Sequence, residues 1–385
     1  MKLKKITAGF LTLLMLCSST FPVFAASPVI GPGIGPGSQI SGPGAVGPGA
    51  PAEPESLPDI PGRVDYFTEE VSSPIVQVVE KYSYEQMCRD IQNLSSRYGS
   101  RMQTHVLGTS ADGRNIYELV LGNPNAERHV LIHAGIHARE YMTPLLVMKQ
   151  LEYGLEFYDR GSYEGQPLAN ILDRVAVHYV PMVNPDGIAL SQFGLGAIRS
   201  AQLQQTIQES YENDLANGRT SQPFDIYLMY WKANARGVDL NANFPAGWEY
   251  LSDRMYSYAN NRGPEPLSEP ETQILANLTN ARGWSATVSY HSMGEVIYWD
   301  YDGNQQSEPS YGMANLIAAS TGYRLAASSG HGGYKDWTQI KDNAIASVTV
   351  ETGNVACPLP LSQYERIWYQ NKMVWAAVAK YVMEY

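Results

Sequence analysis

The chain is poor in cysteine. Only 3 of its 385 residues are cysteines, and one of these, Cys17, lies in the N-terminal apolar run. So few cysteines exclude a disulfide-rich scaffold, and the fold must rest on a hydrophobic core, for which 44% hydrophobic residues are sufficient. A single disulfide between Cys88 and Cys357 stays open, because the sequence does not give the distance between them.

The chain is also short of positive charge. It has 27 Lys and Arg against 38 Asp and Glu, which gives a formal net charge of -11. An acidic chain has no electrostatic reason to bind nucleic acid or an anionic membrane surface. We therefore expect neither as a partner.

Long hydrophobic runs are missing beyond the N-terminus. There, three lysines precede "ITAGFLTLLMLC", and "PVFAAS" follows with small residues. This pattern is typical of a secretory signal peptide over residues 1–25, cleaved near Ala25, and its apolar part is too short for a comfortable membrane span. We expect a mature chain without a membrane span, secreted to the extracellular space or the cell wall.

Composition divides the remainder of the chain. Residues 26–63 repeat Gly-Pro pairs without a three-residue period, which indicates an extended linker rather than collagen. Residues 64–81 form a short N-terminal extension, and globular character extends over 82–385.

Hydrophobic periodicity over residues 82–385 alternates between helices and strands. Residues 83–100 have helical spacing, with Ser83 as the N-cap, and a second helix is expected over 143–158. The expected strands are 104–110, 116–122, 128–135, 174–187, 285–298 and 343–353. This alternation predicts one α/β domain around a mixed sheet.

The stretch "LIHAGIHAREYMTP" places His137 and Glu140 just beyond an expected strand. Gly135 predicts a tight turn, so the pair belongs to a loop rather than to one helix face. Ligands of open α/β sheets bind outside the carboxyl ends of strands, where this loop would lie. Taken alone the motif is weak, but two further apolar strands end at His291 and at Glu351.

These strand ends supply a complete metal site. A catalytic zinc takes three protein ligands with nitrogen or oxygen donors and keeps one open position. His137, Glu140 and His291 are that set, for one zinc per chain, and Asp239 is a candidate partner for the second ring nitrogen of His137. Glu351 would stay off the metal, as a base.

The motifs in combination resemble those of the zinc carboxypeptidases related to carboxypeptidase A, from about Tyr82 to the C-terminus. The matching stretches are "GIHAREYMTP", "VNPDG", "GVDLN", "SEPET", "YHS", "GGYKDW" and "VTVETG". The resemblance implies a single α/β domain with a mixed eight-stranded sheet. It also implies zinc binding by His137, Glu140 and His291, with Glu351 as general base and proton shuttle.

The chain departs from this family at the substrate-binding positions. Lys232 stands where relatives have an arginine for the oxyanion, with Arg236 as the alternative. Asn241 is kept, but Ala242 replaces the arginine that holds a terminal carboxylate in exopeptidases. Ser328 occupies the place of the active-site tyrosine, so we expect His331 or Tyr334 to act instead.

Lys335 occupies the position that, in relatives, contacts the side chain of the residue after the cut bond. With the missing arginine and "FPAGWE", it makes the chain similar to bacterial peptidases that cut γ-D-glutamyl-diaminopimelate bonds, so the resemblance implies a peptidoglycan stem peptide as substrate. A general metallocarboxypeptidase and an inactive wall-binding relative are the alternatives. We expect a monomer.

Other features have simpler interpretations. His105, His129 and His178 have no evident partners and are assigned structural roles, and His133 is expected to pack behind the site. Residues 188–229 form a long insertion that either walls the substrate cleft or elaborates the surface.

Overall fold

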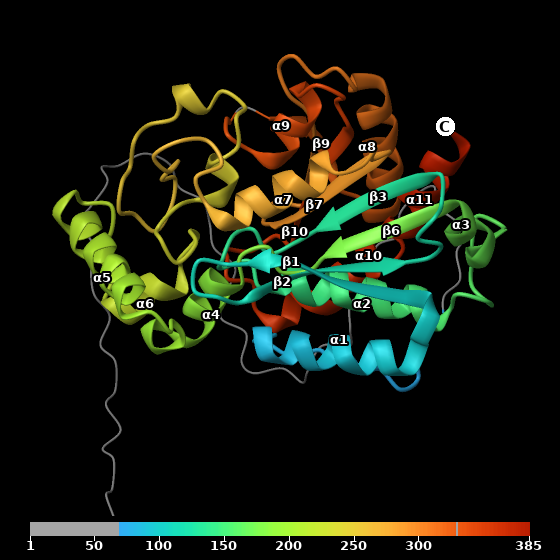
Figure 1. The fold of residues 1–385 in the computed structure, drawn as a ribbon, viewed down its shortest axis with the longest axis horizontal. Helices are drawn as coiled ribbons and strands as arrows, with labels where there is room; N and C mark the ends of the chain where they lie inside the picture. The colour runs from blue at the N-terminus through green and yellow to red at the C-terminus, as the bar shows by residue number, and fades with distance from the viewer. Residues whose placement is uncertain (1–68, 329) are drawn as a thin grey trace, which may run out of the picture. The chain divides into compact units, whose positions relative to one another are not determined.

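A mixed eight-stranded sheet is the central element of the fold. The computed structural model describes residues 69–328 and 330–385. The strand order is β1-β2-β6-β3-β7-β10-β8-β9 (Figure 1). These strands are β1 (Met102–Thr109), β2 (Asn115–Leu121), β3 (Arg128–His133), β6 (Val175–Val180), β7 (Ala286–Ser292), β8 (Val296–Asp300), β9 (Arg324–Ala327) and β10 (Ala346–Thr352). A separate two-stranded sheet pairs β4 (Ser162–Tyr163) with β5 (Gln166–Pro167).

Four neighbouring strands in the middle of the sheet run parallel. β6 pairs with β3, β3 with β7, and β7 with β10, all in parallel register. The flanking pairs β1–β2, β2–β6 and β10–β8 are antiparallel. The carboxyl ends of the four parallel strands therefore meet at one edge of the sheet, which is the edge where ligands bind in open α/β folds.

Side chains alternate between the two faces of the sheet. In β3, Val130 and Ile132 belong to the larger hydrophobic core, while Leu131 belongs to a second core on the opposite face. The larger core includes apolar side chains from α1 (Tyr84–Tyr98), α2 (Met142–Glu156), α3 (Leu168–Arg174), α8 (Ser307–Thr321), α10 (Tyr364–Asn371) and α11 (Val374–Glu384). The second includes α7 (Pro270–Asn280) and α9 (Tyr334–Ile340).

A third, smaller core packs the insertion of residues 188–229 against Ala138 and the segment from Trp231 to Ala235. It joins apolar residues of α4 (Pro185–Phe193), α5 (Ala201–Ala216) and α6 (Phe224–Met229). Short 3₁₀ helices complete the described chain, at Gly99–Arg101, Leu195–Ala197, Leu240–Ala242, Trp248–Tyr250 and Leu361–Gln363. The insertion is thus ordered and packed against the loop that carries His137 and Glu140.

The expected α/β domain with a mixed eight-stranded sheet is confirmed. Ser83 caps α1 as predicted, since its Oγ accepts a hydrogen bond from the Gln86 backbone at 3.1 Å. The strand expected over 174–187 ends early, because the Asn184 side chain caps α4, which begins at Pro185. The strand expected over 285–298 divides into β7 and β8.

Several predictions concern residues outside the described part. The signal peptide over 1–25 and the linker over 26–63 lie there, as do residues 64–68 of the 64–81 extension. The described residues all fall in one compact unit. Among them, every helix is too short or too polar to cross a membrane. Cys88 and Cys357 are free thiols, so the disulfide left open by the sequence is absent from the described structure.

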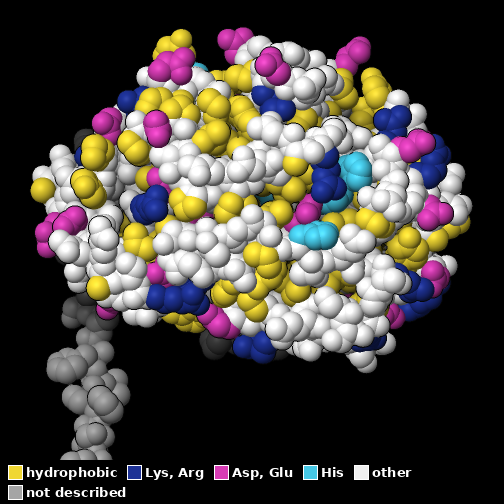
Figure 2. Space-filling model, in the orientation of Figure 1, with side chains coloured by type: hydrophobic (Ala, Val, Ile, Leu, Met, Phe, Trp, Pro, Cys, Tyr) yellow, Lys and Arg dark blue, Asp and Glu magenta, His cyan; other side chains and the backbone are white. Residues whose placement is uncertain are grey.

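The surface is mixed in character. On the face that Figure 2 shows, hydrophobic side chains occur in small groups among polar ones, and histidine side chains lie beside basic and acidic ones. Scattered apolar groups of this kind are normal for a folded domain. The composition of this face therefore does not by itself identify a functional site.

Candidate metal centre

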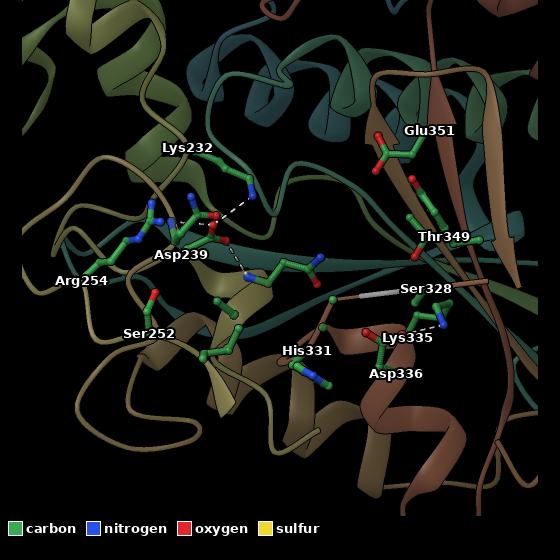
Figure 3. Close-up of a pocket in the computed structure, with 17 residues that line it drawn as sticks. Lys232, Asp239, Ser252, Arg254, Ser328, His331, Lys335, Asp336, Thr349 and Glu351 are labelled. Carbon is green, nitrogen blue, oxygen red and sulfur yellow. Dashed lines mark hydrogen bonds and ion pairs between the residues drawn. The ribbon is translucent and has the colours of Figure 1, made fainter. Parts of the chain in front are cut away.

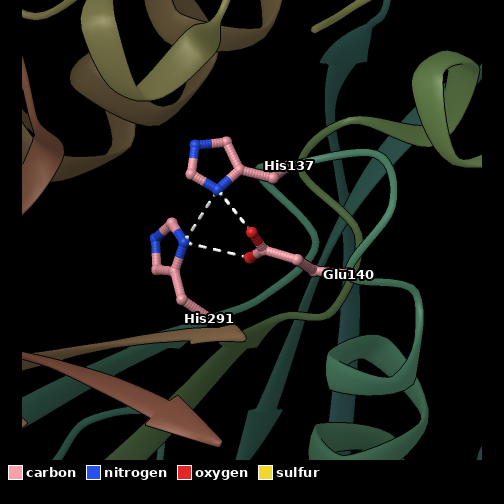
Figure 4. Close-up of side chains that lie close together, drawn as sticks. All are labelled: His137, Glu140 and His291. Atoms are coloured by element: carbon pink, nitrogen blue, oxygen red, sulfur yellow. Dashed lines mark hydrogen bonds and ion pairs between the residues drawn. The ribbon is translucent and has the colours of Figure 1, made fainter. Parts of the chain in front are cut away.

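His137, Glu140 and His291 converge on one point (Figure 4). The Nδ1 atom of His137 lies 2.8 Å from Glu140 Oε1, and the Nδ1 atom of His291 lies 3.1 Å from Glu140 Oε2. The two Nδ1 atoms are themselves 3.1 Å apart. All three side chains are buried. The sequence prediction that these residues come together is therefore matched by the geometry.

The fold explains why residues distant in sequence meet here. β3 ends at His133, and Gly135 turns the chain with a φ of +64°, into the loop that carries His137 and Glu140. A Cβ atom on Gly135 would lie 2.9 Å from both Pro144 Cγ and Ile188 Cδ1, so glycine is required for this approach. His291 comes from β7, the parallel neighbour of β3.

The cluster suits a zinc ion by its donor set. Two imidazole nitrogens and a carboxylate within 4.8 Å of one another are the ligand types of catalytic zinc sites. Two ring nitrogens facing each other at 3.1 Å also need a shared cation or a proton between them. Burial alone would raise the pKa of Glu140, but the charges and hydrogen bonds of His137 and His291 hold it well below its usual range. The carboxylate is therefore ionised and ready to bind a cation.

Further groups fix the ligands in place. Asp239 Oδ1 lies 3.2 Å from His137 Nε2, as expected for the partner of the second ring nitrogen. Asp239 Oδ2 in turn lies 3.0 Å from Lys232 Nζ. Burial would raise the pKa of Asp239, yet Lys232 and then His137 hold it far below its usual range. The Ser292 backbone N–H also donates to Glu140 Oε2 at 3.2 Å.

Glu351 lies beside the cluster on β10. It is the register partner of His291 in the parallel pair of β10 and β7, so the two side chains point to the same face of the sheet. Burial, together with the negative charge of Glu140, raises the pKa of Glu351 to about 7, although His291 acts in the opposite direction. The carboxyl can thus hold or release a proton near neutral pH.

Two hollows open on either side of Glu351. The first has a volume of 510 Å³ and includes in its lining Lys232, Asn241, Arg254, Ser328, His331, Lys335, Asp336 and Glu351 (Figure 3). The second has a volume of 470 Å³ and includes His137, Arg139, Glu140, Tyr230, Lys232, Ser292 and Glu351. Lys232 and Glu351 line both hollows, so a chain bound across the metal cluster would extend into each.

The first hollow contains most of the side chains expected to bind substrate. Lys335 is buried at its wall, with Nζ 2.6 Å from Asp336 Oδ1 and hydrogen-bonded to Gln339 Oε1 at 3.1 Å. Burial lowers the pKa of Lys335, while Asp336 opposes that effect. His331 also lines the hollow, and its Nδ1 lies 2.9 Å from the Tyr301 hydroxyl.

Two expected residues lie elsewhere. Arg236, the alternative for the oxyanion, extends away from this hollow, with its guanidinium 3.7 Å from Glu269, and lines a different surface cavity. Tyr334 is fully buried, with its hydroxyl 2.9 Å from Thr279 Oγ1, because it begins α9 and faces the second core. Neither can take the role that the sequence suggested.

His129, His133 and His178 have partners within the fold, although the sequence had indicated none for His129 and His178, and His105 is exposed on β1. His178 Nδ1 lies 2.8 Å from Glu118 Oε1, and its Nε2 lies 3.0 Å from His129 Nδ1. His133 packs behind the site, its Nε2 2.7 Å from Ser289 Oγ. Burial, followed by the charge of His291, lowers the pKa of His133 to about 3, so it remains neutral.

Sequence reasoning did not single out Arg139 or Arg254 as lining residues. Arg139 stands between two predicted ligands, and this position is the sequence feature that could have indicated its place in the lining. Arg254 lies in the irregular stretch 251–262, which matches no motif and has no periodicity, so only the fold brings it to the hollow.

Comparison with known proteins points to one family. A family model described as zinc carboxypeptidase matches residues 87–373. Gamma-D-glutamyl-L-diamino acid endopeptidase 1 of Lysinibacillus sphaericus is 32% identical over 302 residues, which cover 77% of this chain and 72% of that protein. Carboxypeptidase B of Rattus norvegicus is 24% identical, over 77% of this chain and 69% of that protein.

The fold also matches a solved structure. Bovine thrombin-activatable fibrinolysis inhibitor, solved in complex with tick carboxypeptidase inhibitor, aligns with a TM-score of 0.61 and 21% sequence identity. The alignment covers 80% of this chain and 99% of that chain. At this identity the match speaks for the fold alone.

Proposed function

The chain belongs to the zinc carboxypeptidase family and is a metallopeptidase, and from this premise we propose that it cleaves γ-D-glutamyl-diaminopimelate bonds in cell-wall stem peptides. The observation that carries the substrate assignment is the wall of the first hollow, where Lys335 and Asp336 lie next to each other. The same wall has Ala242 at the position where exopeptidases of the family have an arginine. Its relative from Lysinibacillus sphaericus, named for a gamma-D-glutamyl-L-diamino acid bond, supports the same substrate class.

His137, Glu140 and His291 would hold one zinc ion per chain. When bound, zinc supplies a Lewis acid for the scissile carbonyl and lowers the pKa of a coordinated water toward about 7. Asp239 orients the His137 ring through Nε2, which leaves Nδ1 directed at the cluster.

Glu351 is proposed as the general base. With a pKa of about 7, its carboxylate can take a proton from the attacking water and return it to the leaving amine. Matching the pKa of a base to the working pH favours both transfers. Lys232, which lines both hollows, is proposed to face the developing oxyanion, with Asp239 holding its Nζ in place.

The Lys335–Asp336 pair is proposed to bind the far end of the diaminopimelate side chain. That end carries an ammonium and a carboxylate on one carbon, and the pair offers one group of each sign, 2.6 Å apart. A substrate carboxylate would compete with Asp336 for Lys335 Nζ, while its ammonium would compensate Asp336. Asn241 and His331 line the same hollow and are proposed as further substrate contacts.

The compartment and assembly are part of the proposal. The N-terminal pattern over residues 1–25 supports export, and cell-wall peptides are the exported enzyme's accessible substrate. We propose action as a monomer.

The test compares two peptides with the zinc-loaded mature chain. One is L-alanyl-γ-D-glutamyl-meso-diaminopimelate, and the other is an N-blocked dipeptide with an ordinary α-linked C-terminal residue. We expect the first to be cleaved at least tenfold more efficiently by kcat/KM. Preference for the ordinary dipeptide would instead identify a general metallocarboxypeptidase that removes C-terminal residues.

A further inference from the structure

The first hollow contains three cations, and two of them already have carboxylate partners inside the protein. Lys232 pairs with Asp239 at 3.0 Å, and Lys335 pairs with Asp336 at 2.6 Å. Lys335 Nζ also lies 3.3 Å from the Asp300 carbonyl and 3.1 Å from Gln339 Oε1, so its donors are occupied. The lysines are thus largely compensated before any ligand arrives.

Arg254 is the third cation, and it is different. Among the described residues, none forms a hydrogen bond or ion pair with its guanidinium, and the side chain is exposed to the hollow. Figure 3 shows it on the same side of the hollow as Asp239, opposite Lys335 and Asp336. The Asp239 side of the hollow adjoins the metal cluster, because Asp239 contacts His137.

The loop that carries Arg254 is held from both sides. Asn213, in α5 of the insertion, donates through Nδ2 to the carbonyls of Met255 at 3.0 Å and Tyr256 at 2.8 Å. At the far end of the loop, the Asn260 backbone N–H donates to Asp239 Oδ2 at 3.1 Å. The insertion therefore contributes to the first hollow, because its residue Asn213 holds the loop at the two residues that follow Arg254.

We infer that Arg254 binds the carboxylate that the leaving residue carries next to the cut bond, and that Asn213 positions it. A guanidinium fits a carboxylate through two parallel N–H donors, which a lysine cannot match. Ala242, in the same hollow, offers no charge for that carboxylate. This inference rests on the proposed peptidase function and adds a second anchor: Arg254 takes the near carboxylate, and the Lys335–Asp336 pair takes the far end.

The experiment uses the zinc-loaded enzyme and two forms of each test peptide. One form has a free carboxylate next to the cut bond, and the other has that group as a carboxamide. Arg254→Ala is expected to raise KM at least tenfold for the free acid and to leave the amide unchanged, while Arg254→Lys recovers part of the loss. Binding of the same two peptides to zinc-loaded Glu351→Gln enzyme, with and without Arg254→Ala, gives the affinity without turnover.

Arg236→Ala is the matched control, because it removes an arginine that lines a neighbouring cavity. It is expected to leave the ratio of free acid to amide unchanged. Asn213→Ala is expected to raise KM for the free acid in the wild-type background and to add nothing in Arg254→Ala, as required of a positioning residue.

The outcomes separate the two proposals. Equal losses on acid and amide, or no loss on either, would overturn the assignment of Arg254 while the peptidase function stands. If the wild type cleaves only α-linked peptides, the wall-peptide substrate fails, and the comparison of acid with amide still decides Arg254 on those peptides. If the wild type cleaves none of them, the proposed substrate fails, and equal binding of acid and amide to Glu351→Gln enzyme with and without Arg254→Ala would overturn the assignment of Arg254.

Discussion

At the scale of single residues, Glu351 combines the properties that catalysis requires. It lies on the strand next to His291, it lines both hollows, and burial raises its pKa to about 7. An exposed carboxylate would be a weak base at neutral pH, because its usual pKa is about 4.3. The environment of one side chain, more than its identity, therefore sets its role.

Replacing Glu351 by Gln tests this role directly. The amide has nearly the same shape but cannot take a proton, so kcat is expected to fall by about 10²–10⁴. Zinc content, measured on the purified variant, is expected to stay at the wild-type level because Glu351 is not a ligand. A fall in kcat below tenfold would contradict the assignment of the base.

Asp239 offers a second test at this scale. Asp239→Ala removes the contact to His137 Nε2 and leaves Lys232 without its partner. We expect zinc affinity, measured by competition with a chelator, to fall by roughly 10–100-fold. Asp253→Ala, in the neighbouring loop, is the control and should bind zinc as the wild type does. Unchanged affinity in Asp239→Ala would exclude a role in orienting the ligand.

At the scale of elements, the ends of parallel strands explain what could be predicted from the sequence. β3, β7 and β10 are apolar runs that each lead to a polar residue, so the convergence of His137, Glu140, His291 and Glu351 follows from pattern and fold class together. No comparable rule predicts where the side chains of irregular loops lie. Arg236 and Arg254 both lie in loops, yet of the two only Arg254 lines the first hollow. The guanidinium of Arg236 faces Glu269, whereas Asn213 of α5 holds the loop that follows Arg254.

Glu271, in the first turn of α7, shows how an element supports the site. It is fully buried and accepts hydrogen bonds from the Ala111 backbone at 3.0 Å and from Asn234 Nδ2 at 3.1 Å. Asn234 in turn holds the backbone of Val238, next to Asp239. Burial, together with Asp186, raises the pKa of Glu271 to about 7.

This raised pKa predicts a pH dependence of stability. Because the folded chain holds this proton more tightly than the unfolded chain, the contribution of Glu271 to stability is fully present below about pH 4.5 and is lost as pH rises through about 7. The total is on the order of 3 kcal/mol for a fully buried group. Glu271→Gln should remove this slope, so the unfolding free energy of the wild type minus that of the variant should fall from pH 4.5 to 7.5. A constant difference would contradict a raised pKa.

At the scale of the whole molecule, the metal cluster stands apart from the hydrophobic cores. The sheet is stabilised by two large cores on its opposite faces, and the ligands lie at its edge. The prediction of one α/β domain rested on the alternation of apolar strands and helices along the chain, which the two cores reflect. What the sequence could not reveal is which cations of the first hollow already have a carboxylate partner, because the fold decides that Lys232 and Lys335 are paired with Asp239 and Asp336.

Metal removal should therefore abolish activity without unfolding the chain. After dialysis against a chelator, the far-ultraviolet circular dichroism spectrum is expected to match that of the zinc-loaded enzyme, and added zinc should restore turnover. Metal analysis should give one zinc per wild-type chain and a large loss in His291→Ala. Global unfolding on zinc removal would show that the ion supports the core rather than the site alone.

The most direct test of the account is the cleavage of L-alanyl-γ-D-glutamyl-meso-diaminopimelate by the zinc-loaded mature chain, with products identified by mass spectrometry. The account predicts free diaminopimelate and L-alanyl-D-glutamate, with both products lost in Glu351→Gln. Release of alanine instead, or equal release of diaminopimelate by the wild type and Glu351→Gln, would contradict it.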